Sequence, residues 1–216
     1  MPLFANWHAT PMVTRLLRRL EDLIQESRFN IRTAEWHSVI DPTNPERRGY
    51  SPTSYADWRI ISRRLVPVDP LSTFIDYGTG MGRVAVLAAQ LGYKQVIGID
   101  FSRDLVAIAM ANVRAAKAHL RCPVLITAAD AASFEPPPDS SVLFFHNPFA
   151  GSILTSALTK IRMSYDACQR PLGLVCNLPF ESAFEAVIRQ QQWLTLVSSD
   201  QLHDQRKCLV FHPRDT

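Results

Sequence analysis

The stretch STFIDYGTGMGR at residues 72–83 decides the fold of this chain. Its first half is a short apolar run that ends on Asp76, as in a buried strand, and the residues after the turn repeat as in a helix. Gly78, Gly80 and Gly82 lie between the two. Glycine permits positive φ and lets a ligand approach the backbone without a Cβ in the way. Such a turn at the carboxyl end of a first parallel strand predicts a nucleotide-like ligand.

The spacing of the glycines distinguishes two classes of ligand. A dinucleotide fingerprint, Gly-x-Gly-x-x-Gly, requires its third glycine at position 83, where the chain has Arg83. The third glycine comes one residue early, and Asp76 stands before the turn. A carboxylate repels a pyrophosphate but attracts the ammonium and sulfonium groups of S-adenosylmethionine (SAM). SAM is therefore the ligand favoured by Asp76, the three glycines and Thr79. The disfavoured alternative is a nicotinamide cofactor, as in a dehydrogenase.

Apolar runs and helical patterns alternate along the chain from residue 72 onwards. The predicted strands are 72–77, 95–100, 123–127, 141–146 and 172–177, and the predicted helices between and after them are 81–91, 103–118, 152–167 and 181–191. This alternation predicts βαβ units and an α/β fold with a parallel sheet. Two final runs, 193–199 and 208–212, have no helix between them. They predict an antiparallel hairpin that closes the sheet.

Acidic residues also follow the second and third predicted strands. Asp100 ends the second strand, 22 residues after Gly78. A carboxylate there accepts hydrogen bonds from ribose hydroxyls in nucleotide-binding βαβ units, although capping of the next helix is an alternative. Asp130 follows the third strand, where it could accept a hydrogen bond from an adenine amino group or be a solvated loop acid. Phe101 and Ala131, next to these acids, are assigned to the same cofactor site.

With these residues in place, the sequence resembles the class I SAM-dependent methyltransferases. The turn at 76–82 matches the first motif of that family, Asp100 its second-strand acid and Asp130 its third-strand acid. The resemblance covers about residues 50–213. It implies a three-layer, Rossmann-like fold with a mostly parallel seven-stranded sheet and an antiparallel last strand. It also implies SAM as the methyl donor, with no metal expected.

The fourth predicted strand leads into Asn147-Pro148-Phe149, the candidate catalytic residues. In the family this strand end faces the methyl group, and the triplet resembles the Asn-Pro-Pro-aromatic motif of amino-methylating enzymes with one proline missing. Acceptors from Asn147 and the Pro148 carbonyl would favour a pyramidal nitrogen, and the ring would stack on a planar substrate. A turn role for Asn147 and a core role for Phe149 are the alternatives. His146 is either a general base or a hydrogen-bonded structural residue.

The segment RRGYSPTS at residues 47–54 resembles the part of these enzymes that precedes the first motif and covers SAM. Tyr50 would close over the cofactor, and the hydroxyls of Thr53 and Ser54 would bind its carboxylate. The two arginines that open the segment would read an anionic substrate. A solvated linker whose Ser54 caps the following helix is the alternative.

Residues 11–27 repeat apolar side chains at helical spacing, namely Val13, Leu16, Leu17, Leu20, Leu23 and Ile24. We expect an amphipathic helix whose apolar face packs on the main domain. A basic face for RNA or an acidic partner is the alternative. The irregular, proline-rich stretch that follows divides the chain into an N-terminal helical segment and loop, 1–49, and a methyltransferase domain, 50–216.

Composition bounds the remaining classes of protein. The 216 residues are 47% apolar and 20% charged, as in an ordinary globular protein. No run approaches about 18 uninterrupted apolar residues, and the N-terminus lacks a signal-peptide pattern, so a cytoplasmic protein without a membrane partner is expected. The four cysteines form no CxxC pair and are expected to be free thiols. A net charge of +3 permits a nucleic-acid partner without requiring one.

Taken together, the sequence predicts a SAM-dependent methyltransferase that acts on a nitrogen nucleophile of a protein or small molecule. The chain has no zinc ribbon, RNA-binding module or extended basic tail, so methylation of an RNA or DNA base is the alternative. A non-catalytic SAM-binding protein is a further alternative because the fourth-strand motif is shortened. The oligomeric state is left open.

Overall fold

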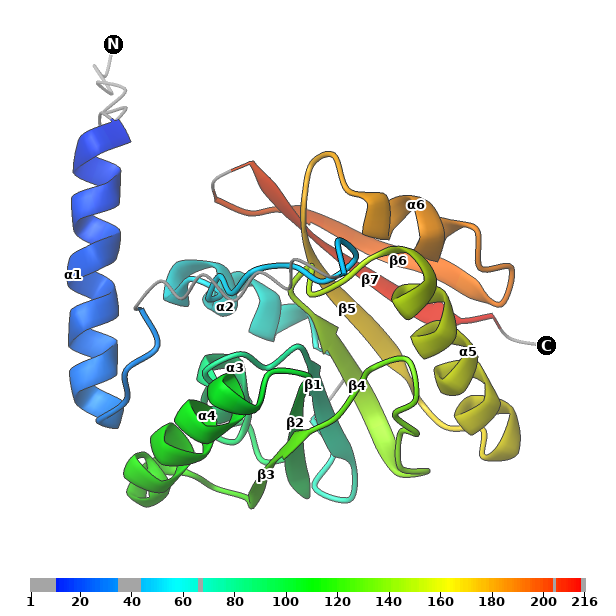
Figure 1. The fold of residues 1–216 in the computed structure, drawn as a ribbon, viewed down its shortest axis with the longest axis horizontal. Helices are drawn as coiled ribbons and strands as arrows, with labels where there is room; N and C mark the ends of the chain where they lie inside the picture. The colour runs from blue at the N-terminus through cyan, green and yellow to red at the C-terminus, as the bar shows by residue number, and fades with distance from the viewer. Residues whose placement is uncertain (1–10, 35–43, 66–67, 204, 215–216) are drawn as a thin grey trace, which may run out of the picture.

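The computed structural model describes residues 11–34, 44–65, 68–203 and 205–214. It contains one seven-stranded sheet with helices on both faces (Figure 1). The strands are β1 (Thr73–Tyr77), β2 (Gln95–Asp100), β3 (Val124–Ala128), β4 (Ser140–Phe145), β5 (Gly173–Pro179), β6 (Leu194–Gln201) and β7 (Arg206–Pro213). The helices are α1 (Pro11–Phe29), α2 (Tyr55–Ile61), α3 (Arg83–Ala88), α4 (Arg103–Ala115), α5 (Gly151–Ala167) and α6 (Ala183–Arg189), with 3-10 turns η1 (Ser62–Arg64) and η2 (Lys117–His119).

The sheet has the strand order β3-β2-β1-β4-β5-β7-β6. The pairs among β1 to β5 are parallel, and β7 is antiparallel to both of its neighbours. The predicted Rossmann-like architecture and its terminal hairpin are therefore confirmed. The chain runs from β1 outward to β3 and then returns to the other side of β1. Because the strand order reverses there, the carboxyl ends of β1 and β4 flank the place where open sheets of this kind bind ligands.

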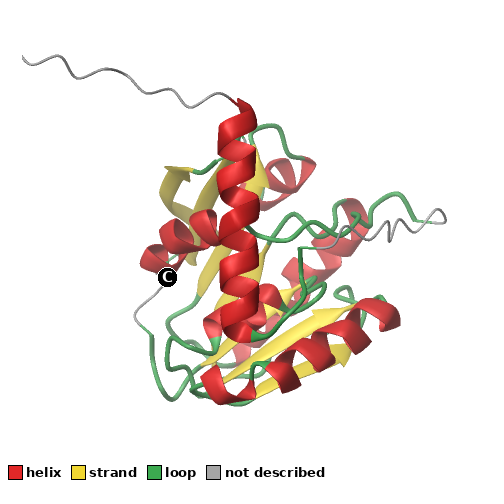
Figure 2. Ribbon diagram, turned by 90° about the vertical axis from the view of Figure 1, so that its left-hand side faces the viewer, coloured by secondary structure: helices red, strands yellow, loops and turns green. Residues whose placement is uncertain are grey.

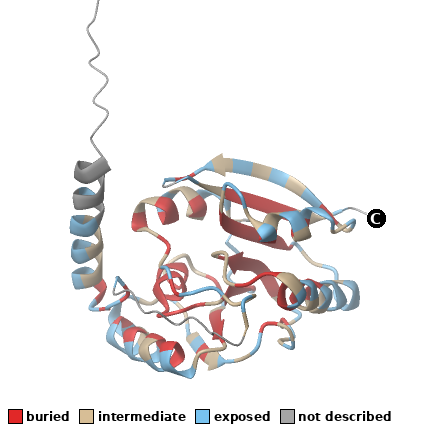
Figure 3. Cartoon of the chain, turned by 45° about the horizontal axis from the view of Figure 1, so that its top comes forward, coloured by how far each residue is buried: buried red, intermediate tan, exposed pale blue. Residues whose placement is uncertain are grey.

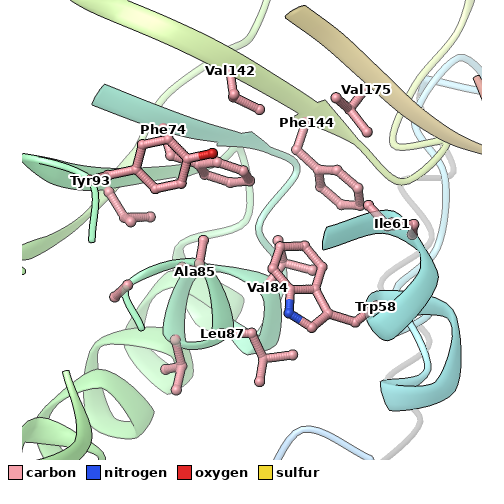
Figure 4. Packing of buried hydrophobic residues seen from close by; sticks show 14 of the residues in the cluster. Trp58, Ile61, Phe74, Val84, Ala85, Leu87, Tyr93, Val142, Phe144 and Val175 are labelled. Carbon is pink, nitrogen blue, oxygen red and sulfur yellow. The ribbon is translucent and has the colours of Figure 1, made fainter. Parts of the chain in front are cut away.

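Two apolar clusters cover the two faces of the sheet. Alternate strand residues such as Phe74 and Phe144 face α2, α3 and α4, whereas their neighbours Ile75 and Phe145 face α5 and α6. Figure 4 shows the Trp58 ring of α2 against the first face, and its centroid lies 6.0 Å from that of Phe144. Burial on both faces explains why the central strands are continuously apolar.

The glycine turn delays the start of the following helix. Helix α3 was expected from residue 81 but begins at Arg83, because its N-cap Gly82 has a φ of 84° and helical residues need negative φ. The start of α2 agrees with the prediction, since Ser54 Oγ accepts a hydrogen bond from Asp57 N at 3.0 Å. Ser54 is therefore an N-cap, the role given as the alternative to cofactor binding.

Helix α1 forms as predicted and stands at one side of the domain (Figures 1 and 2). The expectation that its apolar face packs on the domain is wrong for the side chains that the structure describes. Four of them are 47–65% exposed, namely Leu17, Leu20, Leu23 and Ile24. Figure 3 accordingly shows the described part of this helix mostly as exposed or intermediate. The side chains of Val13 and Leu16 lie outside the described set.

The acidic face of α1 turns toward the domain instead. Arg83 is 2% exposed, and its guanidinium donates to Asp22 Oδ1 at 3.0 Å and to Glu26 Oε1 at 3.1 Å. A buried cation needs anionic partners, and the two carboxylates lie one turn apart on the helix side opposite the leucines. The ion pairs of Arg83 therefore orient α1 so that its described leucines and Ile24 are exposed to solvent. Among the side chains of α1 that the structure describes, that of Phe29 at the end of the helix is buried in the core, with 3% exposure.

No helix in the described parts of the chain has the length and apolar character needed to cross a membrane. All four cysteines are free thiols, and Cys176 and Cys208 are buried. The expectation of free thiols is therefore confirmed.

Candidate active site

All three glycines of the turn adopt left-handed backbone conformations, with φ of 72° at Gly78, 54° at Gly80 and 84° at Gly82. Each also meets a close neighbour. A Cβ on Gly78 would lie 2.4 Å from Pro148 Cβ, and one on Gly80 would lie 2.4 Å from Tyr50 Cδ2. The first two glycines therefore let the fourth-strand loop and the upstream tyrosine approach the turn.

The third glycine, Gly82, has a different structural role. A Cβ on Gly82 would lie 3.1 Å from Ala109 Cβ, so this glycine lets α3 pack closely on α4. Gly82 lines neither of the two cavities described below. Its predicted place in the cofactor site is therefore indirect, through the turn that it completes.

Two buried carboxylates flank the glycine turn. Asp76 is 2% exposed and accepts a hydrogen bond from Thr79 Oγ1 at 2.8 Å. Burial, with a smaller contribution from the nearby Asp100 charge, raises the pKa of Asp76 to about 7. Asp100 accepts from Gly80 N and from Ser102 N, both at 2.9 Å, and burial raises its pKa. Asp100 thus joins the end of β2 to the turn, whereas Ser102 is the side chain that caps α4.

A cavity of about 670 Å³, partly open to solvent, lies at this edge of the sheet. Its walls include nine of the predicted site residues, namely Tyr50, Gly78, Gly80, Asp100, Phe101, Asp130, Ala131, Pro148 and Phe149. These come from five separate segments of the chain.

A second, smaller cavity of about 270 Å³ adjoins the first. Asp76, Thr79 and Thr53 line this cavity and not the larger one. Gly78 and His146 line both, so the two cavities meet at the carboxyl ends of β1 and β4. The predicted cofactor residues are therefore divided between two connected spaces.

A strap formed by residues 44–50 runs along the larger cavity, which residues 47–50 line. Arg48 N donates to Pro148 O at 3.1 Å, and Ala150 N donates to Glu46 O at 2.8 Å. The Arg47 guanidinium lies 4.2 Å above the centre of the Phe101 ring, and its Nη2 is 3.3 Å from an Asp130 carboxylate oxygen. Two residues that were assigned to the cofactor site, Phe101 and Asp130, thus contact the strap.

The strap is held in place because it caps the helix α5, a contact that the sequence patterns did not indicate. The Glu46 carboxylate accepts hydrogen bonds from Ser152 N at 2.9 Å and Ile153 N at 3.1 Å, in the first turn of α5. These bonds lower the pKa of Glu46. Ala150, the N-cap residue of α5, has no side-chain hydrogen bond of its own. Because Glu46 lies 106 residues from Ser152 in the sequence, no local sequence pattern could predict this cap.

The three candidate catalytic residues do not all line a cavity. Pro148 and Phe149 line the larger cavity, and Phe149 is also 5% exposed and packs edge-on against Phe145 at 6.2 Å. Asn147 lines neither cavity, has a φ of 46°, and accepts a hydrogen bond from Ser182 Oγ at 3.4 Å. The polar side chain from this strand end that faces both cavities is that of His146.

Fold and site together define a class of protein. A Rossmann-like sheet with an antiparallel β7, a glycine turn after β1, acids near the ends of β1 and β2 and an acid after β3 are features of a nucleotide-binding domain. Residues 74–162 match the protein family described as methyltransferase domain. This part of the chain therefore matches a methyltransferase domain, which supports the resemblance to class I SAM-dependent methyltransferases that the sequence indicated.

Individual relatives agree with this class. A segment of 46 residues is 48% identical to the ribosomal protein L11 methyltransferase of Alkaliphilus oremlandii (strain OhILAs), and it covers 21% of this chain and 15% of that relative. This chain thus matches only a small part of the length of that curated relative.

Solved structures extend the likeness over most of the chain. A glycopeptide N-methyltransferase complexed with SAM has a TM-score of 0.60 at 10% identity, covering 78% of this chain and 100% of that one. The ribosomal protein L11 methylase of Lactobacillus delbrueckii subsp. bulgaricus has a TM-score of 0.52 at 17% identity, covering 72% and 75%. An rRNA methylase of Streptococcus thermophilus has a TM-score of 0.54 at 14% identity, covering 77% and 100%. At these identities the likeness concerns the fold.

The residues present fit SAM as the cofactor of this domain. The glycine turn leaves backbone open to a ligand, Asp100 and Asp130 offer oxygen acceptors in the larger cavity, and Asp76 offers a carboxylate in the smaller one. Among the described residues, no group of three His, Cys, Asp or Glu side chains is arranged to hold a metal ion.

Proposed function

We propose that this chain is an active SAM-dependent methyltransferase that methylates a nitrogen nucleophile of a protein or a small molecule. The observation that carries the proposal is that the two cavities share Gly78 and His146, close to Pro148 of the fourth-strand loop. A cofactor held by Asp100 and Asp130 in the larger cavity and by Asp76 in the smaller one would cross this junction. The fourth-strand loop would then lie at the place where a methyl acceptor must enter.

SAM, when bound, would supply an electrophilic methyl group on a positively charged sulfur, for direct transfer to a neutral amine whose proton would be released to solvent. Asp100 and Asp130 would hold SAM in the larger cavity, and Asp76 would hold it in the smaller one. The chain itself would contribute positioning and exclusion of water. No strong base is required because a neutral amine already carries a free lone pair.

The choice of acceptor draws on three observations. The fourth-strand triplet resembles the motif of amino-methylating enzymes, and two of the structural relatives are named for a glycopeptide and a ribosomal protein. The net charge of +3 is modest for a nucleic-acid enzyme. An rRNA methylase is also among the structural relatives, so methylation of an RNA base is the second candidate.

Binding of the cofactor is tested by isothermal titration of SAM and S-adenosylhomocysteine. We expect Asp100→Ala to weaken both by more than about tenfold, because it removes a charged acceptor that ribose hydroxyls would use. Asp104→Ala is a matched control, since Asp104 is exposed in the first turn of α4. Unchanged binding in Asp100→Ala would refute the cofactor assignment.

The acceptor is identified by transfer of a labelled methyl group from SAM into separated protein, nucleic-acid and metabolite fractions of a cell extract. Label in protein or metabolites supports the proposal, and label in RNA supports the second candidate. Asn147→Gly tests the side-chain amide alone, because glycine tolerates the φ of 46° at this position. Binding of SAM without transfer to any fraction would indicate a non-catalytic SAM-binding protein.

A further inference from the structure

The side chain at the end of β4 carries a polar atom that the proposed function does not yet use. His146 Nε2 is buried and has no hydrogen-bond partner among the described residues. The other ring nitrogen, Nδ1, contacts Thr53 Oγ1. A buried polar atom without a partner costs free energy, so it marks a place where a polar ligand atom is expected.

The position of His146 relates it to one end of the cofactor. The adenosine-binding acids Asp100 and Asp130 line the larger cavity, whereas Asp76 lines the smaller one. His146 lines both. A molecule whose adenosine lies in the larger cavity can therefore extend only its amino-acid tail past Gly78 to reach Asp76. That tail carries an ammonium group and a carboxylate.

Charges of both signs lie near the smaller cavity. Asp76 and Arg83 line it. Burial lowers the pKa of His146 well below 6.5, and the positive charges of Arg206 and Arg83 lower it further. Arg83 is offset by its own carboxylate partners on α1. The hydrogen bonds of Arg206 go to neutral groups, the Asn177 side-chain oxygen at 2.7 Å and the Asn177 carbonyl at 2.8 Å.

The positive charges of Arg206 and Arg83, which lower the pKa of His146 less than burial does, also favour an anion beside this side chain. Neutral histidine donates from only one ring nitrogen. If the Thr53 hydroxyl donates a hydrogen bond to Nδ1, the ring hydrogen lies on Nε2, which is then a donor. In that arrangement Thr53 selects the tautomer that an anionic oxygen requires.

We propose that His146 Nε2 binds the carboxylate of the amino-acid tail of SAM, with Thr53 as its positioning residue and Asp76 facing the ammonium group. This inference rests on the proposed function, because it assumes that the adenosine of SAM occupies the larger cavity. The Thr53 hydroxyl, which the sequence assigned to the carboxylate directly, then acts through the histidine ring.

The test compares two ligands that differ in the tail. S-adenosylhomocysteine has the amino-acid tail, and 5′-methylthioadenosine has the same adenosine without it. Both are titrated calorimetrically into the full chain and into His146→Asn and His146→Gln. Asparagine places an amide near the position of Nδ1 and keeps a partner for Thr53, whereas glutamine places one near Nε2. His212→Asn is the control, because His212 lines neither cavity.

We expect His146→Asn to weaken the binding of S-adenosylhomocysteine by about tenfold or more, since the lost hydrogen bond is to a charged group. The same variant should weaken the binding of 5′-methylthioadenosine by less than about twofold. His146→Gln should recover most of the loss, and thermal melting should show all variants folded. Equal losses for the two ligands, equal losses in both variants, or no loss would overturn the inference. If the wild-type chain binds neither ligand, the proposed function itself fails.

Discussion

At the scale of single residues, Asp76 combines burial with a charge that the cofactor would need. The side chain is 2% exposed, and burial raises its pKa to about 7 against the stabilising hydrogen bond from Thr79. The free protein therefore holds this carboxyl partly protonated near neutral pH. An ammonium group in the smaller cavity would favour its ionised form, so the site becomes fully charged only with its ligand present.

The raised pKa of Asp76 predicts a particular dependence of stability on pH. The unfolded chain releases this proton near pH 3.8 and the folded chain near pH 7, so the folded state binds more protons between these values. The free energy of unfolding that this group contributes is full below pH 3.8, falls as pH rises, and is lost above about pH 7. We expect the wild type to lose on the order of 2 kcal/mol more than Asp76→Asn between pH 5 and pH 8.

Urea unfolding of both proteins at several pH values measures this difference. Asp104→Asn, the same replacement at an exposed aspartate, serves as the control. Parallel profiles for the wild type and Asp76→Asn would contradict the assigned protonation.

Prediction from sequence was strongest where a residue ends a strand. Asp76, Asp100 and the first two glycines were expected at the carboxyl edge of the sheet, and they line the cavities there. The outcome differs for the fourth strand because a left-handed Asn147 changes the direction of the chain. Which of two adjacent polar side chains then faces the cavity depends on that backbone angle, and residue type alone does not specify it.

At the scale of elements, α1 attaches through charge and exposes its apolar stripe. Besides pairing with Arg83, the Glu26 carboxylate accepts hydrogen bonds from Thr33 N and Thr33 Oγ1, both at 2.6 Å. The helical pattern predicted the helix but not the face that packs. That choice follows from Arg83, which is buried 57 residues further along the chain.

Substitutions on the two faces of α1 should therefore change the free energy of unfolding by different amounts. We expect Glu26→Gln to lower the free energy of unfolding by about 1–3 kcal/mol, because it removes one anionic partner of a buried guanidinium. Leu23→Gln should change it by less than about 0.5 kcal/mol, because Leu23 is 65% exposed. Urea unfolding followed by circular dichroism measures both. A larger loss in Leu23→Gln would mean that the apolar face is the one that packs.

At the scale of the whole molecule, the N-terminal segment is joined to the cofactor site by a continuous set of contacts. Arg83 links α1 to the Thr53 carbonyl at 3.1 Å and to Thr33 Oγ1 at 2.6 Å. The Thr33 carbonyl in turn accepts a hydrogen bond from Tyr50 at 2.7 Å, and that ring covers Gly80. We propose that residues 1–49 and 50–216 are separate in sequence pattern but fold as one unit.

A shortened chain of residues 50–216 tests this proposal. It lacks Phe29 and Ile31, each 3% exposed in the core, and the partner of the Tyr50 hydroxyl. We expect a lower melting temperature by scanning calorimetry and weaker binding of S-adenosylhomocysteine than in the full chain. If residues 50–216 melt at the temperature of the full chain and bind equally well, the two parts are independent.

The sequence by itself determined the alternation of strands and helices, the closing hairpin, the glycine turn and the acids that follow the first three strands. These features depend on local periodicity and on residues next to each other in the chain, so they can be recognised without coordinates. The tertiary structure alone decided which face of α1 packs, that Glu46 caps α5, and that His146 joins two cavities. Each of these depends on a charge or polar atom from a distant segment, whose partner is fixed only when the chain has folded.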